Sequence, residues 1–377
     1  MTTVEAEPLK VKQLRLLTVL SSRLSASNIA NEENDKSPRG SLYQRTLKSD
    51  MMDESFLEKA PRIRRSLYKH LPFYVAEAIE SFIVRKDYDV IVSWSDMHAL
   101  VFAAILKLTR RKCPHVALMF WISKPKKAFL LKHVYSGIST LVLWTSAHME
   151  FAINKLGIPP EKIKFIPYYV DQTFFRPIPS ETDMICSVGI EMRDYPTFIR
   201  AMRGVDIRCH IAAGAARGIL TETVKAIYRE PSLPPNITVG RLSPTELRAL
   251  YSRSRFVVIP LLPTDSDNGL TSILEAMAMG KAVICSRTSG QRDVIVEGKT
   301  GLFVPQGDPS ALREAITYLW DRPALADQMG QEGRKLVEEK YTLEQFIRNI
   351  KEAAEEAYQK SEPRISWDLL DPERVSG

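Results

Sequence analysis

The chain of 377 residues has few cysteines and no long apolar run. Because a helix that crosses a membrane needs about 18 consecutive apolar residues, no membrane-spanning helix is expected. The segment Met1–Pro8 carries acids and no apolar core, which does not fit a secretory signal. The four cysteines lie far apart and without metal-ligand spacing. This pattern predicts reduced thiols in a cytoplasmic protein and no structural zinc.

Internal repeats and low-complexity tracts are also missing. Aromatic residues are not interleaved with glycines and no recognition motif occurs, so nucleic acid is not an expected partner. What is present is ordinary for a globular protein, with 45% hydrophobic and 26% charged residues. The length favours two domains, because single cores stop growing at this size.

Positive charge is concentrated in one part of the chain. The formal net charge is +7, yet residues 101–165 alone hold eleven Lys and Arg against two acids. Such an excess favours an anionic partner, which is a membrane surface, a phosphorylated acceptor or, less favoured for the reason above, nucleic acid. Residues 107–132 mix these cations with Trp121, Phe129 and leucines, which predicts contact with an anionic membrane surface. The alternative is that the charged residues are simply exposed to solvent while the apolar residues between them pack into the core.

Buried strands alternate with helical stretches, which predicts an α/β protein with parallel sheets. Proline-rich Phe165–Pro179 is expected to be a linker. It divides an N-terminal acceptor-binding domain, 1–170, from a C-terminal nucleotide-sugar-binding domain, 171–350. Residues 351–377 are a helix end and tail that pack back on the first domain. Polar Asn28–Asp53 is expected to be a mobile loop with a short helix. The expected strands are Leu14–Ser21, Asp89–Ser95, Val116–Trp121, Thr140–Thr145, Met184–Val188, Ile207–Ala212, Ile237–Val239, Phe256–Pro260 and Val283–Ser286.

The segment Asp267–Gly280 carries the chemistry. After the strand that ends at Pro260, a polar loop leads into the expected helix Leu270–Met279, which Gly280 stops. Backbone N–H groups and the positive helix end would suit a diphosphate. The carboxylate of Glu275 makes sense beside phosphate if it accepts two hydrogen bonds from the vicinal diol of a ribose. Asp267, in the loop, is placed for hexose hydroxyls.

Asp267 and Glu275, followed by Ala-Met-Ala-Met-Gly, resemble the Glu-(seven residues)-Glu motif of family 4 retaining glycosyltransferases. These belong to the glycosyl transferases group 1. The resemblance implies the GT-B fold, in which two Rossmann-like doubly wound domains face each other across a deep cleft. It implies that Glu275 binds the nucleotide ribose and that Asp267 is a shortened contact to the donor sugar. Asn268, Gly269, Leu270 and Thr271 would bind the diphosphate and sugar.

Further matches flank this motif. Gly189 begins a segment in which Arg193 stands where the family has a phosphate-binding Lys, while Ile190 stands at its usual Arg position. Arg241, in Gly240-Arg241-Leu242-Ser243, lies in a stretch that resembles the base-binding region. Thr300–Val304 matches a strand that we interpret as structural.

In the N-terminal half, Ser93–Ala99 resembles a His/Asp-rich segment of glycogen-synthase-like relatives, in which a His reaches the donor sugar. Asp96 and His98 are the matching residues. The alternative is that Asp96 caps a helix and His98 is an ordinary surface residue. Leu20–Ser27, rich in serine, occupies the place of the family's glycine-rich loop and matches it weakly.

The resemblance implies a retaining, metal-independent hexosyltransferase without a cofactor. Its co-substrate would be a nucleotide-sugar, a UDP-sugar in the first instance, and its acceptor a hydroxyl group of a lipid or glycan intermediate. His98, Asp96, Asp267 and Arg193 would form the catalytic set. The protein would be cytoplasmic and peripheral on the inner face of the membrane. Two alternatives are a nucleotide-sugar 2-epimerase of the same fold and a donor-binding scaffold that has lost catalysis.

Overall fold

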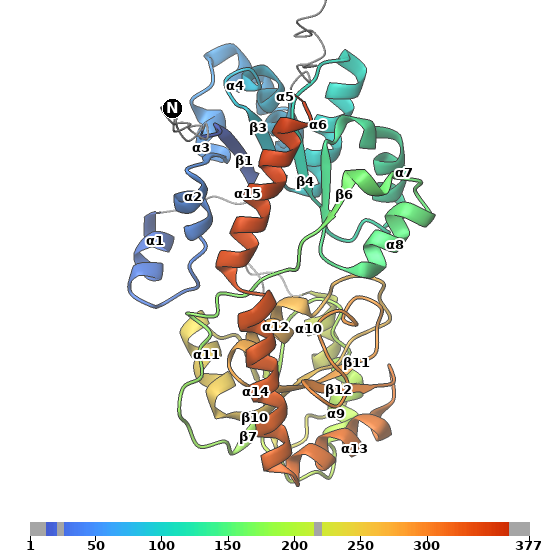
Figure 1. Ribbon diagram of the computed structural model, residues 1–377. Coiled ribbons are helices and arrows are strands. Elements are labelled where there is room, and N and C mark those ends of the chain that lie inside the picture. The colour runs from blue at the N-terminus through green and yellow to red at the C-terminus, as the bar shows by residue number, and fades with distance from the viewer. Residues whose placement is uncertain (1–12, 21–25, 215–220, 362–377) are drawn as a thin grey trace, which may run out of the picture.

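The protein is described by a computed structural model over residues 13–20, 26–214 and 221–361. Two six-stranded sheets, parallel throughout, run in the orders β2-β1-β3-β4-β5-β6 and β12-β11-β10-β7-β8-β9. Figure 1 shows the two bodies one above the other, with helices around each sheet. The expected GT-B architecture of two facing doubly wound domains is therefore confirmed.

The strands of the first sheet are β1 (Leu16–Leu20), β2 (Asp50–Met52), β3 (Val90–Trp94), β4 (His115–Leu118), β5 (Thr140–Leu143) and β6 (Ile163–Phe165). Those of the second are β7 (Met184–Val188), β8 (Cys209–Ala212), β9 (Ile237–Gly240), β10 (Ser254–Ile259), β11 (Ala282–Ser286) and β12 (Gly301–Val304). Central strands such as β3, β7 and β11 are nearly continuous apolar runs because both faces of a parallel sheet are covered by helices. The short edge strands β2 and β6 carry polar residues and were missed from the sequence.

The helices follow the strands in both halves of the chain. In the first half they are α1 (Ala26–Glu33), α2 (Leu42–Leu47), α3 (Glu54–Glu58), α4 (Arg62–Tyr68), α5 (Phe73–Val84), α6 (Asp96–Thr109), α7 (Pro125–Val134) and α8 (Ser146–Asn154), with the 3-10 turns η1 (Tyr135–Gly137) and η2 (Pro160–Lys162). In the second half they are α9 (Tyr195–Met202), α10 (Glu222–Tyr228), α11 (Pro244–Arg253), α12 (Leu270–Ala278), α13 (Pro309–Trp320), α14 (Pro323–Lys340) and α15 (Leu343–Gln359).

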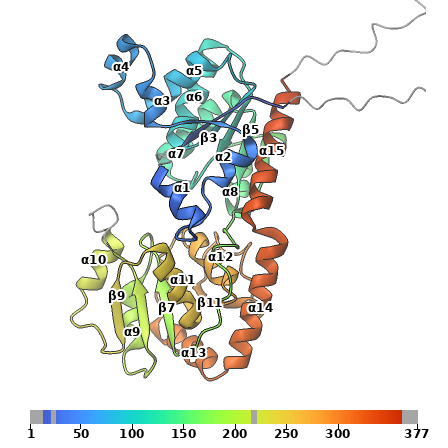
Figure 2. The ribbon, with the colours of Figure 1, turned by 90° about the vertical axis from the view of Figure 1, so that its left-hand side faces the viewer.

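The chain passes between the two sheets twice. Residues 166–183 connect β6 to β7, and the short step from α14 to α15 leads back. Figure 2 shows α15 rising from the lower body along the side of the upper one. There α15 packs against α2, β3 and β4. The division into domains at 170 and 350 stays a prediction, since it was drawn from the sequence pattern alone.

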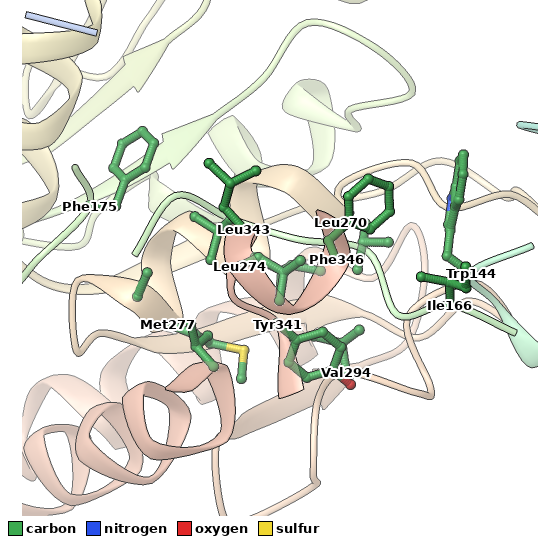
Figure 3. Packing of buried hydrophobic residues seen from close by; sticks show 14 of the residues in the cluster. Trp144, Ile166, Phe175, Leu270, Leu274, Met277, Val294, Tyr341, Leu343 and Phe346 are labelled. Atoms are coloured by element: carbon green, nitrogen blue, oxygen red, sulfur yellow. The ribbon is translucent and has the colours of Figure 1, made fainter. Parts of the chain in front are cut away.

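One hydrophobic cluster joins the two bodies. It holds side chains of both sheets together with residues of the two crossing segments. Figure 3 shows Trp144 of the first body near Leu270 of α12, with Ile166, Tyr341 and Phe346 around them. A continuous apolar cluster of this size favours one orientation of the two bodies, because rotating them would expose buried surface.

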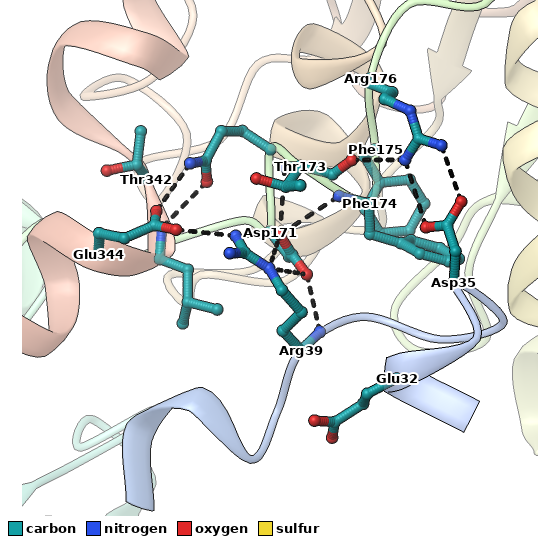
Figure 4. A network of polar contacts seen from close by, with 12 residues as sticks. Glu32, Asp35, Arg39, Asp171, Thr173, Phe174, Phe175, Arg176, Thr342 and Glu344 are labelled. Carbon is teal, nitrogen blue, oxygen red and sulfur yellow. Dashed lines mark hydrogen bonds and ion pairs between the residues drawn. The ribbon is translucent and has the colours of Figure 1, made fainter. Parts of the chain in front are cut away.

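Residues 28–53 are structured, which corrects the expectation of a mobile loop. They contain most of α1, all of α2 and the edge strand β2. Asp171 of the first crossing segment accepts hydrogen bonds from the backbone N–H of Arg39 at 2.7 Å and from its guanidinium Nη2 at 2.7 Å. Figure 4 shows that Arg39 also pairs with Glu344 at the start of α15 and that Asp35 pairs with Arg176. Asp35 pairs with Arg248 as well. These ion pairs hold the polar segment in place, which its composition alone did not reveal.

Within the described ranges, none of the helices is long and apolar enough to cross a membrane.

Candidate active site in the cleft between the sheets

A cavity of about 400 Å³ lies where the carboxyl ends of the two sheets face each other. In doubly wound folds, ligands bind at this edge of the sheet. The first body and its crossing segment contribute Phe120, Trp121, Lys124, Lys127 and Tyr168. The second body contributes Ile190, Glu191, Arg193 and the run 266–271. The cavity therefore includes Arg193, Asp267, Asn268, Gly269, Leu270 and Thr271 from the predicted site.

The first turn of α12 opens into this cavity. Gly269 is its N-cap, with φ +95°, and no side chain caps the helix start. Leu270, Leu274 and Met277 face the core, whereas Thr271 and Glu275, one turn apart, share a neighbouring and less buried face. The loop before α12 is tightly held, because Gln291 donates to the carbonyl of Asn268 at 2.5 Å. The backbone N–H groups and positive end of α12 thus form a fixed anion site.

Arg193 places a buried positive charge beside the helix start. Its side chain is 4% exposed, and its guanidinium donates to the carbonyls of Val188 and Glu191, each at 2.8 Å, and to the hydroxyl of Ser272 at 3.1 Å. Among the residues that the structure describes, Arg193 forms no ion pair. Its hydrogen bonds go to neutral groups, and the carboxyl of Glu275, whose pKa its charge lowers, forms no ion pair with it, so this buried charge favours an anionic ligand.

Gly189 allows Arg193 to occupy that position. Its φ is +116°, and a Cβ built on it would lie 2.2 Å from the Nη2 atom of Arg193. Gly189 does not itself line the cavity, so its predicted role as a donor contact is replaced by this structural one.

Gly189→Ala should therefore lower the free energy of unfolding by more than the roughly 1–3 kcal/mol that a strained backbone conformation costs alone, because the guanidinium must also move. Gly204→Ala is the matched control, since Gly204 also has a positive φ, +76°, but nothing within 4 Å of the added atom. Urea denaturation of both variants measures the difference. Equal losses would show that the Arg193 contact adds nothing.

Two lysines of the first body face Arg193 across the cavity. Lys124 lies over the ring of Trp121, with 3.9 Å from its Nζ to the ring centroid. Lys127 pairs with Asp96 and is 20% exposed. The sequence analysis assigned both to a membrane surface, whereas the structure places them in the cleft. They add two ammonium groups to the cavity wall, and that of Lys127 is paired with the carboxylate of Asp96. The signal that could have found them is their position just after β4, at the carboxyl edge of the first sheet.

The two carboxylates of the motif lie in different surroundings. Asp267 lines the cavity and accepts hydrogen bonds from Trp144 Nε1 at 2.6 Å and from the hydroxyl of Ser266 at 2.7 Å. Glu275 does not line the cavity; it is partly buried and accepts a hydrogen bond from the hydroxyl of Tyr251 at 2.8 Å. Desolvation raises the pKa of Glu275 from its usual 4.5 to about 7, against the lowering effects of Tyr251 and Arg193.

His98 does not fit its predicted role. Its side chain is fully buried in the first body, bonded to Ser81 at 3.0 Å and Ser93 at 2.9 Å, and stacked on Phe102. Burial also lowers its pKa well below the ordinary value. Both the donor contact and the alternative of a surface residue are therefore wrong. His98 follows Asp96 by two residues on a helix, which turns the imidazole toward the core rather than toward the cleft.

Asp96 does not reach the cavity itself but contacts two residues that line it. One carboxylate oxygen accepts from the backbone N–H of Phe120 at 2.7 Å, and the other pairs with Lys127. Asp96 does not line the cavity, so the structure gives it the role of positioning Lys127 rather than of touching a donor sugar. No side-chain hydrogen bond caps α6, which removes the helix-cap alternative.

A different histidine lies near the cleft. His148, in the first turn of α8, is 1% exposed, and neither ring nitrogen has a hydrogen-bond partner among the described residues. Burial lowers its pKa, while the nearby carboxylates of Asp267 and Asp265 act in the opposite direction. No motif surrounds His148 in the sequence, so no sequence signal points to it.

The remaining predicted residues lie outside the cavity. Arg241 follows β9 and is exposed at a distance from the cavity wall, so the structure does not bring it to the predicted set. In the serine-rich stretch Leu20–Ser27, positions 21–25 lie outside the described residues.

The fold defines an α/β protein of GT-B architecture with a cavity between its two bodies. Residues 178–336, which make up most of the second body, match the model of the family glycosyl transferases group 1. This match confirms the resemblance to the glycosyl transferases group 1.

Solved structures support the fold across the whole chain. Sucrose-phosphate synthase from Thermosynechococcus elongatus is 16% identical, covers 92% of this chain and 100% of its own, and superposes with a TM-score of 0.70. Anabaena HepE, solved in complex with UDP-glucose, is 14% identical over 91% of this chain and 100% of its own, with a TM-score of 0.68. At such low identity these likenesses show the fold alone.

Curated relatives match shorter stretches. A D-rhamnosyltransferase of Pseudomonas aeruginosa is 34% identical over 94 residues, which are 25% of this chain and 24% of the relative. A D-inositol 3-phosphate glycosyltransferase of Corynebacterium diphtheriae is 30% identical over 129 residues, 33% of this chain and 28% of the relative. The chain thus spans about a quarter of the length of these two relatives.

Proposed function

We propose that the chain is a glycosyltransferase that binds a nucleotide-sugar in the cleft cavity and transfers the sugar to a hydroxyl acceptor. The observation that carries the proposal is the buried guanidinium of Arg193, which forms no ion pair with the residues that the structure describes, beside the start of α12, which no described side chain caps. A diphosphate would accept hydrogen bonds from both, and Lys124 and Lys127 would offset its charge from the other side. The family match of residues 178–336 supports the same reading.

The residues around the cavity suggest how each part of the donor is held. The α12 start and Arg193 would stabilise the diphosphate as it leaves, which is the largest electrostatic demand of the reaction. Asp267, oriented by Trp144, would accept hydrogen bonds from sugar hydroxyls. Glu275 would accept two hydrogen bonds from the ribose diol. The resemblance to family 4 adds three properties to the proposal. The donor is a UDP-hexose, the anomeric configuration is retained, and the reaction needs no metal.

Incubating the purified protein with UDP-, GDP- and ADP-sugars tests the activity. A transferase should release the nucleoside diphosphate slowly to water and faster with an acceptor. A retaining enzyme should give product with the anomeric configuration of the donor. An epimerase would change the sugar without releasing the diphosphate, and a scaffold would do neither. D-inositol 3-phosphate belongs in the acceptor panel because of the relatives named above.

Donor binding should depend on pH through Glu275. Because the pKa of this carboxyl is raised to about 7, the acceptor-only carboxylate is the minor form at acid pH. Donor affinity should therefore rise about tenfold from pH 6 to pH 8, as the carboxyl loses its proton. Calorimetric titration with UDP-glucose at several pH values measures this. The same dependence in Glu275→Gln would assign it to another group.

Peripheral contact with an anionic membrane remains part of the proposal, but on a smaller surface than residues 107–132. The exposed face of α7 combines Lys126 and Lys132 with Phe129, which is 64% exposed, and Leu130. This mixture suits the interface of an anionic bilayer. Cosedimentation with anionic vesicles at low and high salt tests it, and no binding at low salt would remove the idea.

A further inference from the structure

A second cavity, of about 590 Å³, lies at the end of the first body away from the cleft. It is formed by the carboxyl end of α6, the η1 turn and the last residues of α15. Because α6 starts at the cleft edge with Asp96, its other end lies at the opposite edge of the sheet. Figure 1 shows the upper end of α15 at this far end of the molecule. The two cavities have no residue in common.

The wall of this far cavity is strongly basic. The described residues that line it include the six cations Lys107, Arg110, Arg111, Lys112, Lys162 and Lys360 but a single acid, Glu161. Within the ranges described by the structure, none of these six cations forms an ion pair. Like charges gathered around one concavity repel each other, and an anion in the cavity would relieve that repulsion.

The helix end explains only part of this charge. The carbonyls of Leu106 and Lys107 are already bonded to the backbone N–H groups of Arg111 and Arg110, each at 3.2 Å. Lys107 itself donates to the carbonyl of His133 at 2.5 Å. The side chains of Arg110, Arg111 and Lys112 are exposed and make no hydrogen bond in the described part of the chain. Capping the negative end of α6 therefore leaves most of the cations unused.

The base of the cavity is rigid and polar. A Cβ on Gly137 would lie 2.3 Å from the carbonyl oxygen of Ala103, so the η1 turn packs directly on α6. Ser136, Ser139 and Ser361 add hydroxyl groups to the wall. Lys162 donates to the carbonyl of Ile138 at 2.5 Å, and partial burial, aided by Lys360, lowers its pKa. A fixed floor with hydroxyls and cations suits an oxyanion with several charges.

We propose that this far cavity binds a phosphate-bearing ligand. Guanidinium groups bind phosphate bidentately, and lysines and serine hydroxyls can take its remaining oxygens. The phosphate could belong to a soluble molecule or to a phosphomonoester lipid headgroup, which offer the same chemistry. This site is separate from the donor cleft, and the proposal does not rest on the proposed function.

The test compares two triple variants with the same change in charge. Arg111→Ala/Lys112→Ala/Lys360→Ala removes three cations from the far cavity. Lys36→Ala/Lys59→Ala/Lys155→Ala removes three exposed lysines of the first body that do not line it. Calorimetric titration with inorganic pyrophosphate at low salt is the first arm. We expect the affinity of this site for pyrophosphate to fall at least about tenfold in the cavity variant and little in the control. A tenfold loss corresponds to about one charge-assisted hydrogen bond.

Pyrophosphate bound in the donor cleft would persist in both variants, so only a selective loss reports on the far cavity. The second arm is cosedimentation with phosphatidylcholine vesicles that contain phosphatidic acid. Selective loss of pyrophosphate binding identifies a soluble ligand, and selective loss of vesicle binding alone identifies a lipid headgroup. If the two variants behave equally in both arms, the proposal is overturned. The anion would then be attracted by the overall positive charge of the protein and not by the far cavity.

Discussion

Glu275→Gln is expected to weaken binding of the nucleotide-sugar by about 100-fold or more. The carboxylate of Glu275 is an acceptor only, so it can receive both hydroxyls of a ribose diol in charge-assisted hydrogen bonds. Such bonds are worth about 1.5–3 kcal/mol each, and an amide can replace them only in part. Turnover at low donor concentration should fall by the same factor. Titration calorimetry with UDP-glucose and initial rates measure the two effects.

The fold should survive this change. The folded pKa of Glu275 lies above its unfolded value of 4.5, so the native state holds more protons between these pH values and stability falls as the pH rises from about 4.5 to about 7. Glu275→Gln removes this fall in stability because the amide does not titrate. It also keeps an acceptor for the hydroxyl of Tyr251. At pH 8 its free energy of unfolding should equal or exceed that of the parent. Glu314→Gln, on the exposed face of α13, is the control for a lost negative charge. Undiminished donor affinity in Glu275→Gln would reject the ribose assignment.

The sequence predicted the parts of the fold that are dictated by local pattern. Met184–Val188 was placed without error, and the other central strands were placed within a few residues, because buried parallel strands are continuous apolar runs. β2 and β6 were missed because a short edge strand has polar residues and little pattern. The segment 28–53 looked mobile because its order depends on ion pairs such as Arg39 with Asp171, whose partners lie far away in the chain.

The candidate site likewise has one wall that local sequence predicts and one that depends on long-range packing. Asp267 to Thr271 form one continuous stretch, and a strand, loop and helix bring them together without help from the rest of the chain. The opposing wall comes from residues about 140 positions earlier, and only the packing of the two bodies puts Lys124 and Lys127 there. The motif predicted where His98 stands in the chain but not which side of its helix it occupies. The packing of α6 turns His98 into the core of the first body.

Lys127→Met should lower both turnover and stability, for two separable reasons. The ammonium group lines the cavity, where loss of one preorganised charge facing a leaving diphosphate typically costs about 100- to 1,000-fold in kcat. The same change leaves the carboxylate of Asp96, with its side chain 10% exposed, without its partner. Breaking a buried pair in this way costs about 3–5 kcal/mol, and somewhat less where, as here, one partner is 20% exposed.

Adding Asp96→Asn separates the two effects. In Asp96→Asn/Lys127→Met no buried charge is left unpaired, and the amide can still accept the hydrogen bond from the backbone N–H of Phe120. The free energy of unfolding should therefore return most of the way to that of the parent, while kcat should remain as low as in Lys127→Met. Urea denaturation and steady-state rates on the parent, both single variants and the double variant complete the cycle. Recovery of kcat together with stability would mean that Lys127 only holds the fold, and the positive charge facing Arg193 across the cleft would then have to come from Lys124.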